Sequence, residues 1–168
     1  AEAGIAMIDA PVSGGVMRAQ DGSLTIMVGA DDAAALDRAM PILEVLGERI
    51  FRVGRLGAGD AMKAANNYAA AATYAATAEA LAMGKSFGLD PAQMVEIINV
   101  STGRSFVSEL VMKEHVVTGA YATGFGLALL AKDVGIAARL ADGLGLEAPV
   151  SQLVHERMQS AVGKCGEG

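Results

Sequence analysis

The sequence predicts a mainly helical protein in which a small mixed α/β region is followed by a helical region. Residues 60–83 contain twelve alanines and neither glycine nor proline, and alanine is the residue that most favours helix. Before residue 56, short segments with β-branched residues alternate with one helical segment. From Gly57 onward, every segment has the apolar spacing typical of helices. This change predicts two domains, residues 1–56 and residues 57–168.

Three segments of the first region are expected to be strands. The segment "GIAMIDAPV" (residues 4–12) predicts a short strand that runs into a turn at Pro11. Alternating residues predict a second strand within "DGSLTIMVGA" (residues 21–30), and "RIFRVG" (residues 49–54) predicts a third. Three short strands and one helix are few for a stable sheet, so we expect the edge of a larger one.

A helix is expected between the second and third strands, over "AAALDRAMPILEVL" (residues 33–46). Asp31 or Asp32 can cap its N-terminus, and Gly47 is expected to end it. Pro41 falls inside the helical pattern, where a proline removes a backbone donor and crowds the preceding turn. We therefore expect a kink there, or a break into two short helices.

The second region predicts a succession of helices. The alanine-rich helix of residues 60–83 would be about 36 Å long at 1.5 Å per residue. Gly84 and Gly88 mark its end region, and Asp90 followed by Pro91 is a strong start signal for the next helix. Three further amphipathic segments follow, "SFVSELVMKEHVV", "GFGLALLAKDVGIAARLADGLG" and "APVSQLVHERMQSAVGKC".

The composition argues against several classes of function. The 168 residues are 52% hydrophobic with a net charge of −6 and no Lys/Arg cluster, which disfavours nucleic acid and anionic membranes as partners. The most apolar long run, residues 68–83, is too weakly hydrophobic to span a membrane. Cys165 is the only cysteine, and His115 and His155 lack ligand-like neighbours, so we expect no disulfide and no metal site. The first residues do not look like a signal peptide, and we expect a cytoplasmic protein.

The stretch "DAPVSGG" (residues 9–15) places a hydroxyl and two glycines at the end of a strand. Gly14 and Gly15 let backbone N–H groups come close to a ligand, and Ser13 adds a hydroxyl donor. Converging donors of this kind suit a carboxylate or a phosphate. A plain tight turn after Pro11 would explain the same residues.

The start of the long helix, "VGRLGAGDAMKAANNY" (residues 53–68), carries a cation and two amides on a surface otherwise rich in Ala and Met. Lys63 and Asn67 are four residues apart and share one face. Such a lysine can act as a general acid or base if desolvation or a second cation lowers its pKa, and the amide can hold a substrate oxygen beside it. The alternative is a solvated helix start in which Asp60 pairs with Lys63.

The glycines of "GRLGAG" (residues 54–59) come directly before the long helix. Their spacing differs from the Gly-x-Gly-x-x-Gly turn that holds dinucleotides, and no acidic residue follows at the usual distance. We interpret this segment as the turn that begins the helix, and not as a dinucleotide site.

The segment "GFGLALLAKDVGIAARLA" (residues 124–141) places Lys132 and Asp133 between apolar stretches. These residues form either a surface ion pair or part of a cofactor site. In the second interpretation, Lys132 contacts an anionic or polar part of a bound cofactor, with Asp133 beside it. Phe125 would then give an apolar wall to a planar ring.

Together, these motifs resemble the β-hydroxyacid dehydrogenase family, of which 3-hydroxyisobutyrate dehydrogenase is a member. The resemblance rests on "DAPVSGGVMRAQDGSLTIMVGA", "PILEVLGERIFRVGRLGAGDAMKAANN" and "FGLALLAKDVGIA", in this order. It implies an all-helical domain like the C-terminal domain of 6-phosphogluconate dehydrogenase, with a long central helix, after a small α/β remnant of a Rossmann domain. Because family members begin with a longer Rossmann sheet, this chain is expected to be the C-terminal half of such an enzyme. Alone, it is expected to be inactive and to bind neither NAD nor NADP tightly.

The resemblance also implies roles for the motifs. The substrate-binding residues would be Ser13, Gly14, Gly15 and Asn67. The catalytic acid/base would be Lys63. The residues near the nicotinamide of NAD or NADP would be Lys132, Phe125 and Asp133. The implied reaction is oxidation of the CH–OH group of small 3-hydroxy acids, by a homodimer or homotetramer.

Two other functions stay open at this point. One is a reductase of small aldehyde acids such as tartronate or succinic semialdehyde, which is the same chemistry in the reverse direction. The other is a stand-alone helical oligomerisation module without catalysis. A Gly-rich βαβ unit encoded upstream in the same reading frame would exclude the module.

Overall fold

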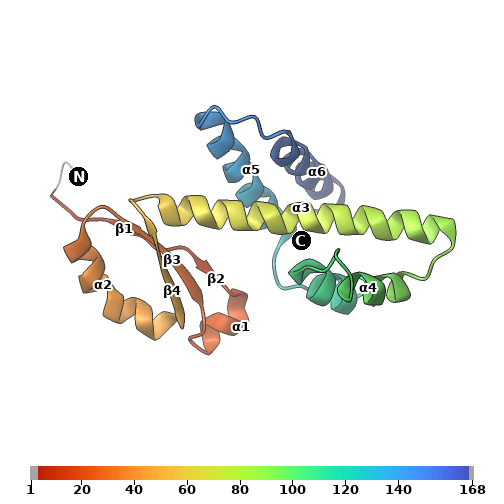
Figure 1. The fold of residues 1–168 in the computed structure, drawn as a ribbon, viewed down its shortest axis with the longest axis horizontal. Coiled ribbons are helices and arrows are strands. Elements are labelled where there is room, and N and C mark those ends of the chain that lie inside the picture. The colour runs from red at the N-terminus through yellow and green to blue at the C-terminus, as the bar shows by residue number, and fades with distance from the viewer. Residues whose placement is uncertain (1–3, 167–168) are drawn as a thin grey trace. The chain divides into compact units, whose positions relative to one another are not determined.

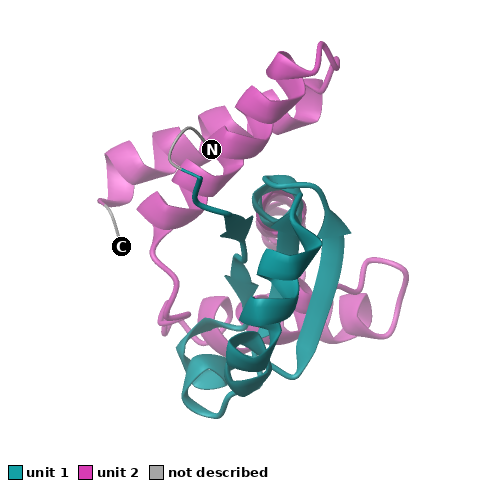
Figure 2. Ribbon diagram, turned by 90° about the vertical axis from the view of Figure 1, so that its left-hand side faces the viewer, with its two compact units in different colours: residues 1–66 teal, residues 67–168 magenta. Residues whose placement is uncertain are grey.

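The computed structural model describes residues 4–166. They form mostly helix, with one small sheet (Figure 1). Two compact units divide the chain, one up to Asn66 and one from Asn67 onward (Figure 2). The division falls within α3 (Ala58–Phe87), a single helix of 30 residues whose first turns belong to the first unit.

The first unit contains a sheet built around β3 (Thr25–Ala30). β1 (Ile8–Asp9) and β2 (Val12–Ser13) pair with β3 in antiparallel orientation. β4 (Arg49–Gly54) pairs with β3 in parallel, and β1 and β2 therefore share the other edge. The predicted strand at residues 49–54 is confirmed with the same bounds, and the strand predicted within residues 21–30 is confirmed as β3.

β1 and β2 are two parts of one extended segment that is interrupted at a proline. Asp9 faces Gly29 and Val12 faces Ile26, so the register passes unchanged through Pro11. The N–H of Met27, opposite Pro11, donates to the carbonyl of Pro11 at 3.0 Å. Pro11 has no N–H, so the reciprocal hydrogen bond to Met27 is missing. The predicted turn at Pro11 is therefore wrong, because the proline removes one hydrogen bond without reversing the chain.

α2 (Ala33–Leu46) connects β3 to β4 and packs on one face of the sheet. Asp32 caps it by accepting a hydrogen bond from the N–H of Ala35 at 3.0 Å, and Gly47 ends it, both as predicted. The helix continues through Pro41, so the expected break is wrong. Buried residues on both sides of the exposed proline hold α2 against the sheet, and this core comprises Leu24, Ile26, Val28, Leu36 and Leu43.

The first turn of α3 is held by the carboxylate of Asp9, the last residue of β1. Asp9 Oδ1 accepts from the N–H of Gly57 at 2.7 Å, and Oδ2 accepts from the N–H of Asp60 at 2.8 Å. A helix N-terminus has N–H groups without intrahelical partners and a partial positive charge, and a carboxylate stabilises both. A residue 48 positions before Gly57 therefore helps to fix where the long helix begins.

Two glycines make room for this contact. A Cβ on Gly29 would overlap Asp9 Oδ1 and lie 2.6 Å from the carbonyl oxygen of Arg55. A Cβ on Gly59 would overlap the carbonyl oxygen of Met27 and lie 2.6 Å from Asp9 Oδ2. The start of α3 can approach β3 this closely only because neither position carries a side chain.

The C-terminus of α3 is closed by Gly88, one of the two glycines predicted to mark the end region, and the helix continues to Phe87, beyond the predicted residue 83. The N–H of Leu89 donates to the carbonyl of Gly84 at 2.9 Å, and the N–H of Gly88 donates to that of Lys85 at 3.0 Å. Gly88 has φ +102°, so the end of α3 is a Schellman motif with glycine in the left-handed position. Gly84 stays within the helix, where a Cβ would overlap the side chain of Met94 from the next helix.

The second unit consists of most of α3 and four further helices, α4 (Pro91–Asn99), η1 (Val107–Val116), α5 (Leu127–Gly143) and α6 (Pro149–Cys165). Asp90 caps α4 by accepting from the N–H groups of Ala92 and Gln93, with Pro91 in the first turn, as predicted. Two apolar cores lie along α3. One packs against α5 and α6, and the other against α4 and η1.

Two segments differ from the sequence expectation. The helix predicted over "SFVSELVMKEHVV" is η1, a π-helix of 10 residues. Val107 and Met112 are both buried and are five residues apart, which is the hydrogen-bonding period of a π-helix. The N–H of Ser105 donates to the hydroxyl of Ser108, and the N–H of Ser108 donates to that of Ser105, so these bonds hold the first turn. The segment after Gly14, for which no helix was expected, forms the short helix α1 (Gly15–Gln20).

The close approach of α3 to β3 predicts opposite effects for two helical Gly→Ala substitutions. Gly59→Ala should destabilise the protein by about 1–3 kcal/mol, because the added methyl group overlaps the Met27 carbonyl. Gly143→Ala in α5 has no atom within 4 Å of its new Cβ and should stabilise by about 0.4–1 kcal/mol. Urea unfolding followed by circular dichroism measures both. Equal midpoints for the two variants would contradict this account of the α3 start.

Candidate functional site

The turn of Ser13, Gly14 and Gly15 follows β2 and leads into α1. Gly14 has φ +140° and Gly15 has φ +64°, values that residues with side chains rarely adopt. A Cβ on Gly14 would also lie 2.7 Å from the side chain of Arg18. Ser13 is half-buried at the last position of β2. The two glycines thus permit a backbone path that residues with side chains would rarely follow.

Lys63 and Asn67 lie one turn apart on α3. Lys63 is half-buried, and Asn67 is only 7% exposed, whereas Asn66 is exposed. A solvated helix start would leave the polar side chains of one face in water. The burial of Asn67 therefore argues against that alternative, because a buried amide needs partners within the protein.

Asp133 on α5 is the partner that links two of the sequence motifs. The amide Nδ2 of Asn67 donates to Asp133 Oδ2 at 2.6 Å, and Lys132 Nζ lies 3.0 Å from Asp133 Oδ1. The side chain of Asp133 is 13% exposed and that of Lys132 is 58% exposed. One carboxylate therefore fixes a buried amide on α3 and holds an exposed ammonium group beside it. Lys132 and Asp133 form the ion pair that the sequence suggested, but only Lys132 lies at the surface, because the Asp133 side chain is mostly buried.

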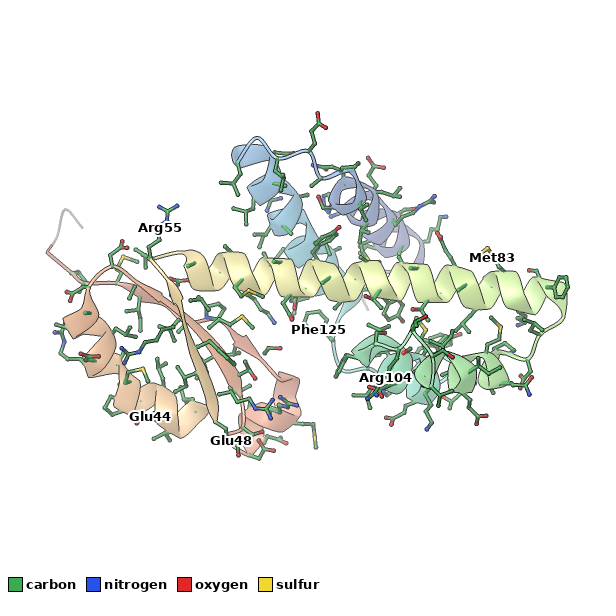
Figure 3. All side chains as sticks on the ribbon, viewed as in Figure 1. Glu44, Glu48, Arg55, Met83, Arg104 and Phe125 are labelled. Atoms are coloured by element: carbon green, nitrogen blue, oxygen red, sulfur yellow. The ribbon has the colours of Figure 1, made fainter. Side chains whose placement is uncertain are left out.

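Phe125 lies in the loop that leads into α5 (Figure 3). Its side chain is 43% exposed, and its backbone N–H donates to the hydroxyl of Thr123 at 3.4 Å. The loop backbone is thus partly fixed while much of the ring surface faces solvent. A half-exposed phenyl ring in this position can pack against a planar ligand.

The glycine-rich turn of residues 54–59 begins α3, as predicted. The carboxylate of Asp9 accepts from the N–H groups of Gly57 and Asp60, which are the kind of groups that hold a pyrophosphate at a helix N-terminus. A phosphate at this point would meet the charge of Asp9. The start of α3 is therefore unsuited to a dinucleotide, which agrees with the glycine spacing.

Other properties of residues 4–166 limit the chemistry available. Hydrogen bonds from the hydroxyl and the N–H of Ser23 lower the pKa of Asp21. The pKa of Tyr74 is raised, mainly by burial and to a smaller extent by the nearby Tyr121. In this part of the chain, no group of three or more His, Cys, Asp or Glu residues could hold a metal ion. No helix within it is long and apolar enough to cross a membrane.

Two contacts at the site were missed by sequence reasoning. The capping of α3 by Asp9 joins positions far apart in the chain, and no spacing rule connects them. The bond between Asn67 and Asp133 joins α3 to α5 across 66 positions. The available signal for the second was an acidic residue that follows a lysine between two apolar stretches of the helix.

The chain matches two families along its length. Residues 57–168 match the family described as NAD-binding of NADP-dependent 3-hydroxyisobutyrate dehydrogenase. Residues 1–54 match the family described as the NAD binding domain of 6-phosphogluconate dehydrogenase.

Curated and solved relatives agree with these matches. The chain is 47% identical to 2-(hydroxymethyl)glutarate dehydrogenase of Eubacterium barkeri, over 82% of this chain and 45% of that protein. It is 40% identical to NAD-dependent L-serine dehydrogenase of Pseudomonas aeruginosa, over 90% of this chain and 53% of that one. The solved 3-hydroxyisobutyrate dehydrogenase of Mycobacterium tuberculosis with L-serine superimposes with a TM-score of 0.84 at 30% identity, covering 95% of this chain and 57% of that one. The chain thus spans about half the length of the relatives that it matches.

The contact between Asn67 and Asp133 predicts unequal effects for substitutions of neighbouring residues. Asp133→Ala should cost about 1–3 kcal/mol, because it removes an acceptor from a buried amide. Lys132→Gln breaks a mostly exposed ion pair and should cost less than about 1 kcal/mol. Urea unfolding of both variants, of Asn67→Ala and of Asn67→Ala combined with Asp133→Ala tests this. Similar midpoints for the two single variants, or fully additive effects in the double variant, would count against a structural bond between the two side chains.

Proposed function

The chain belongs to the β-hydroxyacid dehydrogenase family, and on this premise we propose that it is part of an NAD(P)-dependent oxidoreductase that acts on the CH–OH group of small 3-hydroxy acids. The observation that carries the proposal is the pairing of a buried amide, Asn67, with Asp133, one turn from Lys63 on the same helix. Because the chain spans about half the length of its relatives, the activity is proposed for the longer protein that contains it.

The names of the relatives suggest one substrate class. In 2-(hydroxymethyl)glutarate, L-serine and 3-hydroxyisobutyrate, a hydroxymethyl group and a carboxylate share one carbon, and only the third substituent differs. We propose that the substrate of this protein has the same core, HOCH2–CHX–COO⁻. Its carboxylate would be bound by the hydroxyl of Ser13 and the backbone of Gly14 and Gly15, whose positive φ values support this role.

Proton transfer is assigned to Lys63. Oxidation requires a base for the hydroxyl proton while a hydride leaves the carbon, and the reverse reaction requires an acid at the same place. A lysine can perform both if its surroundings bring its pKa toward the working pH. The half-burial of Lys63 on an Ala-rich helix supports this.

Asn67 would hold the substrate oxygen one turn from Lys63. Its amide is oriented by Asp133, so Asp133 is proposed as a positioning residue as well as a member of the cofactor side. NAD or NADP, when bound, supplies the acceptor for the hydride. Lys132, held by Asp133, and the half-exposed ring of Phe125 have the charge and shape to flank a nicotinamide.

Two other functions, a reductase and an oligomerisation module, make different use of the same residues. The reductase of small aldehyde acids uses the same groups in the reverse direction, and substrate kinetics separate the two. A purely structural oligomerisation module has no use for Lys63, Asn67 and Asp133 as a set. We retain the division into a cofactor-domain remnant at residues 1–56 and a helical substrate and dimerisation domain at residues 57–168, and a cytoplasmic location, as parts of this proposal.

Replacement of Lys63 in the protein encoded by the full reading frame tests the mechanism. Lys63→Ala should lower turnover by about 10²–10⁴-fold, the usual share of general acid–base catalysis. Lys63→Arg should lower turnover as well, because a guanidinium group does not release a proton near neutral pH. Lys85→Ala is the matched control, since Lys85 is an exposed lysine in the last turn of the same helix.

Turnover against pH is measured for all four proteins, and thermal unfolding verifies that each is folded. Activity near that of the wild type in Lys63→Ala, or rescue by Lys63→Arg, would show that another group moves the proton. The family assignment would then stand without this mechanism.

Association through the helical region is proposed as well. Large apolar side chains are exposed where α5 turns into α6, namely Leu144, Leu146, Val150 and Leu153, with exposed fractions of 52–71%. Light scattering should find a dimer or larger assembly of constant mass across a range of concentrations. Leu146→Glu combined with Leu153→Glu should shift it toward monomer, whereas Ile42→Glu on α2 should not. A monomer in the wild-type protein would refute the proposal.

A further inference from the structure

A cleft of about 340 Å³ lies between α5 and α6, within the second unit. Both helices contribute one face to it, and its lining residues are Ala128, Ala131, Lys132, Gly135, Arg139, His155, Gln159 and Val162. The volume falls within the range of small-molecule sites, about 300–1,000 Å³. The cleft is therefore large enough to bind a ligand.

The polar residues that line the cleft favour an anion. Lys132 and Arg139 on α5 carry positive charge, and Gln159 and His155 on α6 can donate hydrogen bonds. Among the described residues that line the cleft, none is acidic. The charge of Lys132 is partly balanced by Asp133, whose Oδ1 lies 3.0 Å from Lys132 Nζ. The lining is still positive in a chain whose net charge is −6.

His155 has an unsatisfied ring nitrogen at this cleft. Its Nδ1 is buried and has no hydrogen-bond partner among residues 4–166. The ring packs closely on Gly135, where a Cβ would lie 2.7 Å from His155 Cε1 and 3.2 Å from Nδ1. The guanidinium of Arg139 lies 3.4 Å from the same Cβ position. The glycine thus lets an imidazole and a guanidinium lie close together at one end of the cleft.

We propose that the cleft between α5 and α6 binds a phosphate group. A carboxylate carries a single charge, and one arginine can satisfy it. A phosphate can accept hydrogen bonds on several oxygens from a guanidinium, an imidazole and an amide together, with a second cation on the same face of α5. The phosphate belongs either to a free ion or ester, or to a nucleotide. This inference goes beyond the proposed dehydrogenase function and requires no turnover.

The two histidines of the chain provide a direct measurement. His115 and His155 give two imidazole Cε1–H signals in proton NMR, and His155→Gln assigns them. Inorganic phosphate is titrated into the 168-residue chain at neutral pH, with chloride replaced so that ionic strength stays constant. The His155 signal should shift and saturate, whereas the His115 signal should not.

Two arginine variants with the same change in net charge test the residues involved. Arg139→Gln removes a lining cation and should weaken the phosphate affinity about tenfold or more, as expected for a charge-assisted hydrogen bond. Arg157→Gln removes an exposed arginine of α6 that does not line the cleft and should change the affinity less than about twofold. Both side chains are exposed, so neither substitution disturbs a buried contact.

The outcomes separate the proposal from its alternatives. A His155 shift that fails to saturate, an equal effect of chloride, or equal weakening by the two arginine variants would each overturn it. If NADP⁺ or NAD⁺ saturates the shift at a lower concentration than phosphate, the phosphate belongs to a nucleotide. If only phosphate or pyrophosphate does so, it belongs to a free ion or ester. An inactive enzyme with an intact titration would refute the proposed function and leave this site standing.

Discussion

The contact on which the first unit most depends is that between the Asp9 carboxylate and the first turn of α3. It bonds two N–H groups of the helix start and so ties the edge of the sheet to the helix that carries Lys63. The same two bonds use donors that could otherwise hold a phosphate. The N-terminus of the long helix is therefore occupied by Asp9, and the side chains of its first turns stay available to the proposed site.

A second carboxylate has a comparable task in the second unit. Asp133 receives the amide of Asn67 from α3 and the ammonium of Lys132 from its own helix. A carboxylate between an amide and a cation keeps both oriented, and its low exposure makes the bond to the buried amide the more costly one to lose. The groups that the family resemblance assigns to substrate and to cofactor are thus held by one shared acceptor.

The sequence predicted those features that depend on a few neighbouring residues. The capping of α2 by Asp32 and of α4 by Asp90, and the helix end at Gly88, followed from local rules. The path of the chain through Pro11 and Pro41 did not, because pairing with β3 and packing on the sheet outweigh the missing N–H. The roles of Ser13, Lys63 and Asn67 stay predictions. The bond from Asn67 to Asp133 was not predicted, because a contact across 66 positions has no signature in spacing.

The crowding around Asp9 constrains how this protein can change over generations. Asp9, Gly29 and Gly59 occupy one small volume, in which a methyl group at either glycine would overlap an oxygen atom. A larger residue at either position becomes tolerable only after the carboxylate or the helix has moved, and each of those moves removes the reason for keeping the glycines. The three positions are therefore expected to be inherited as a set, so that the path from one functional sequence to another passes through coordinated substitutions and not through single ones.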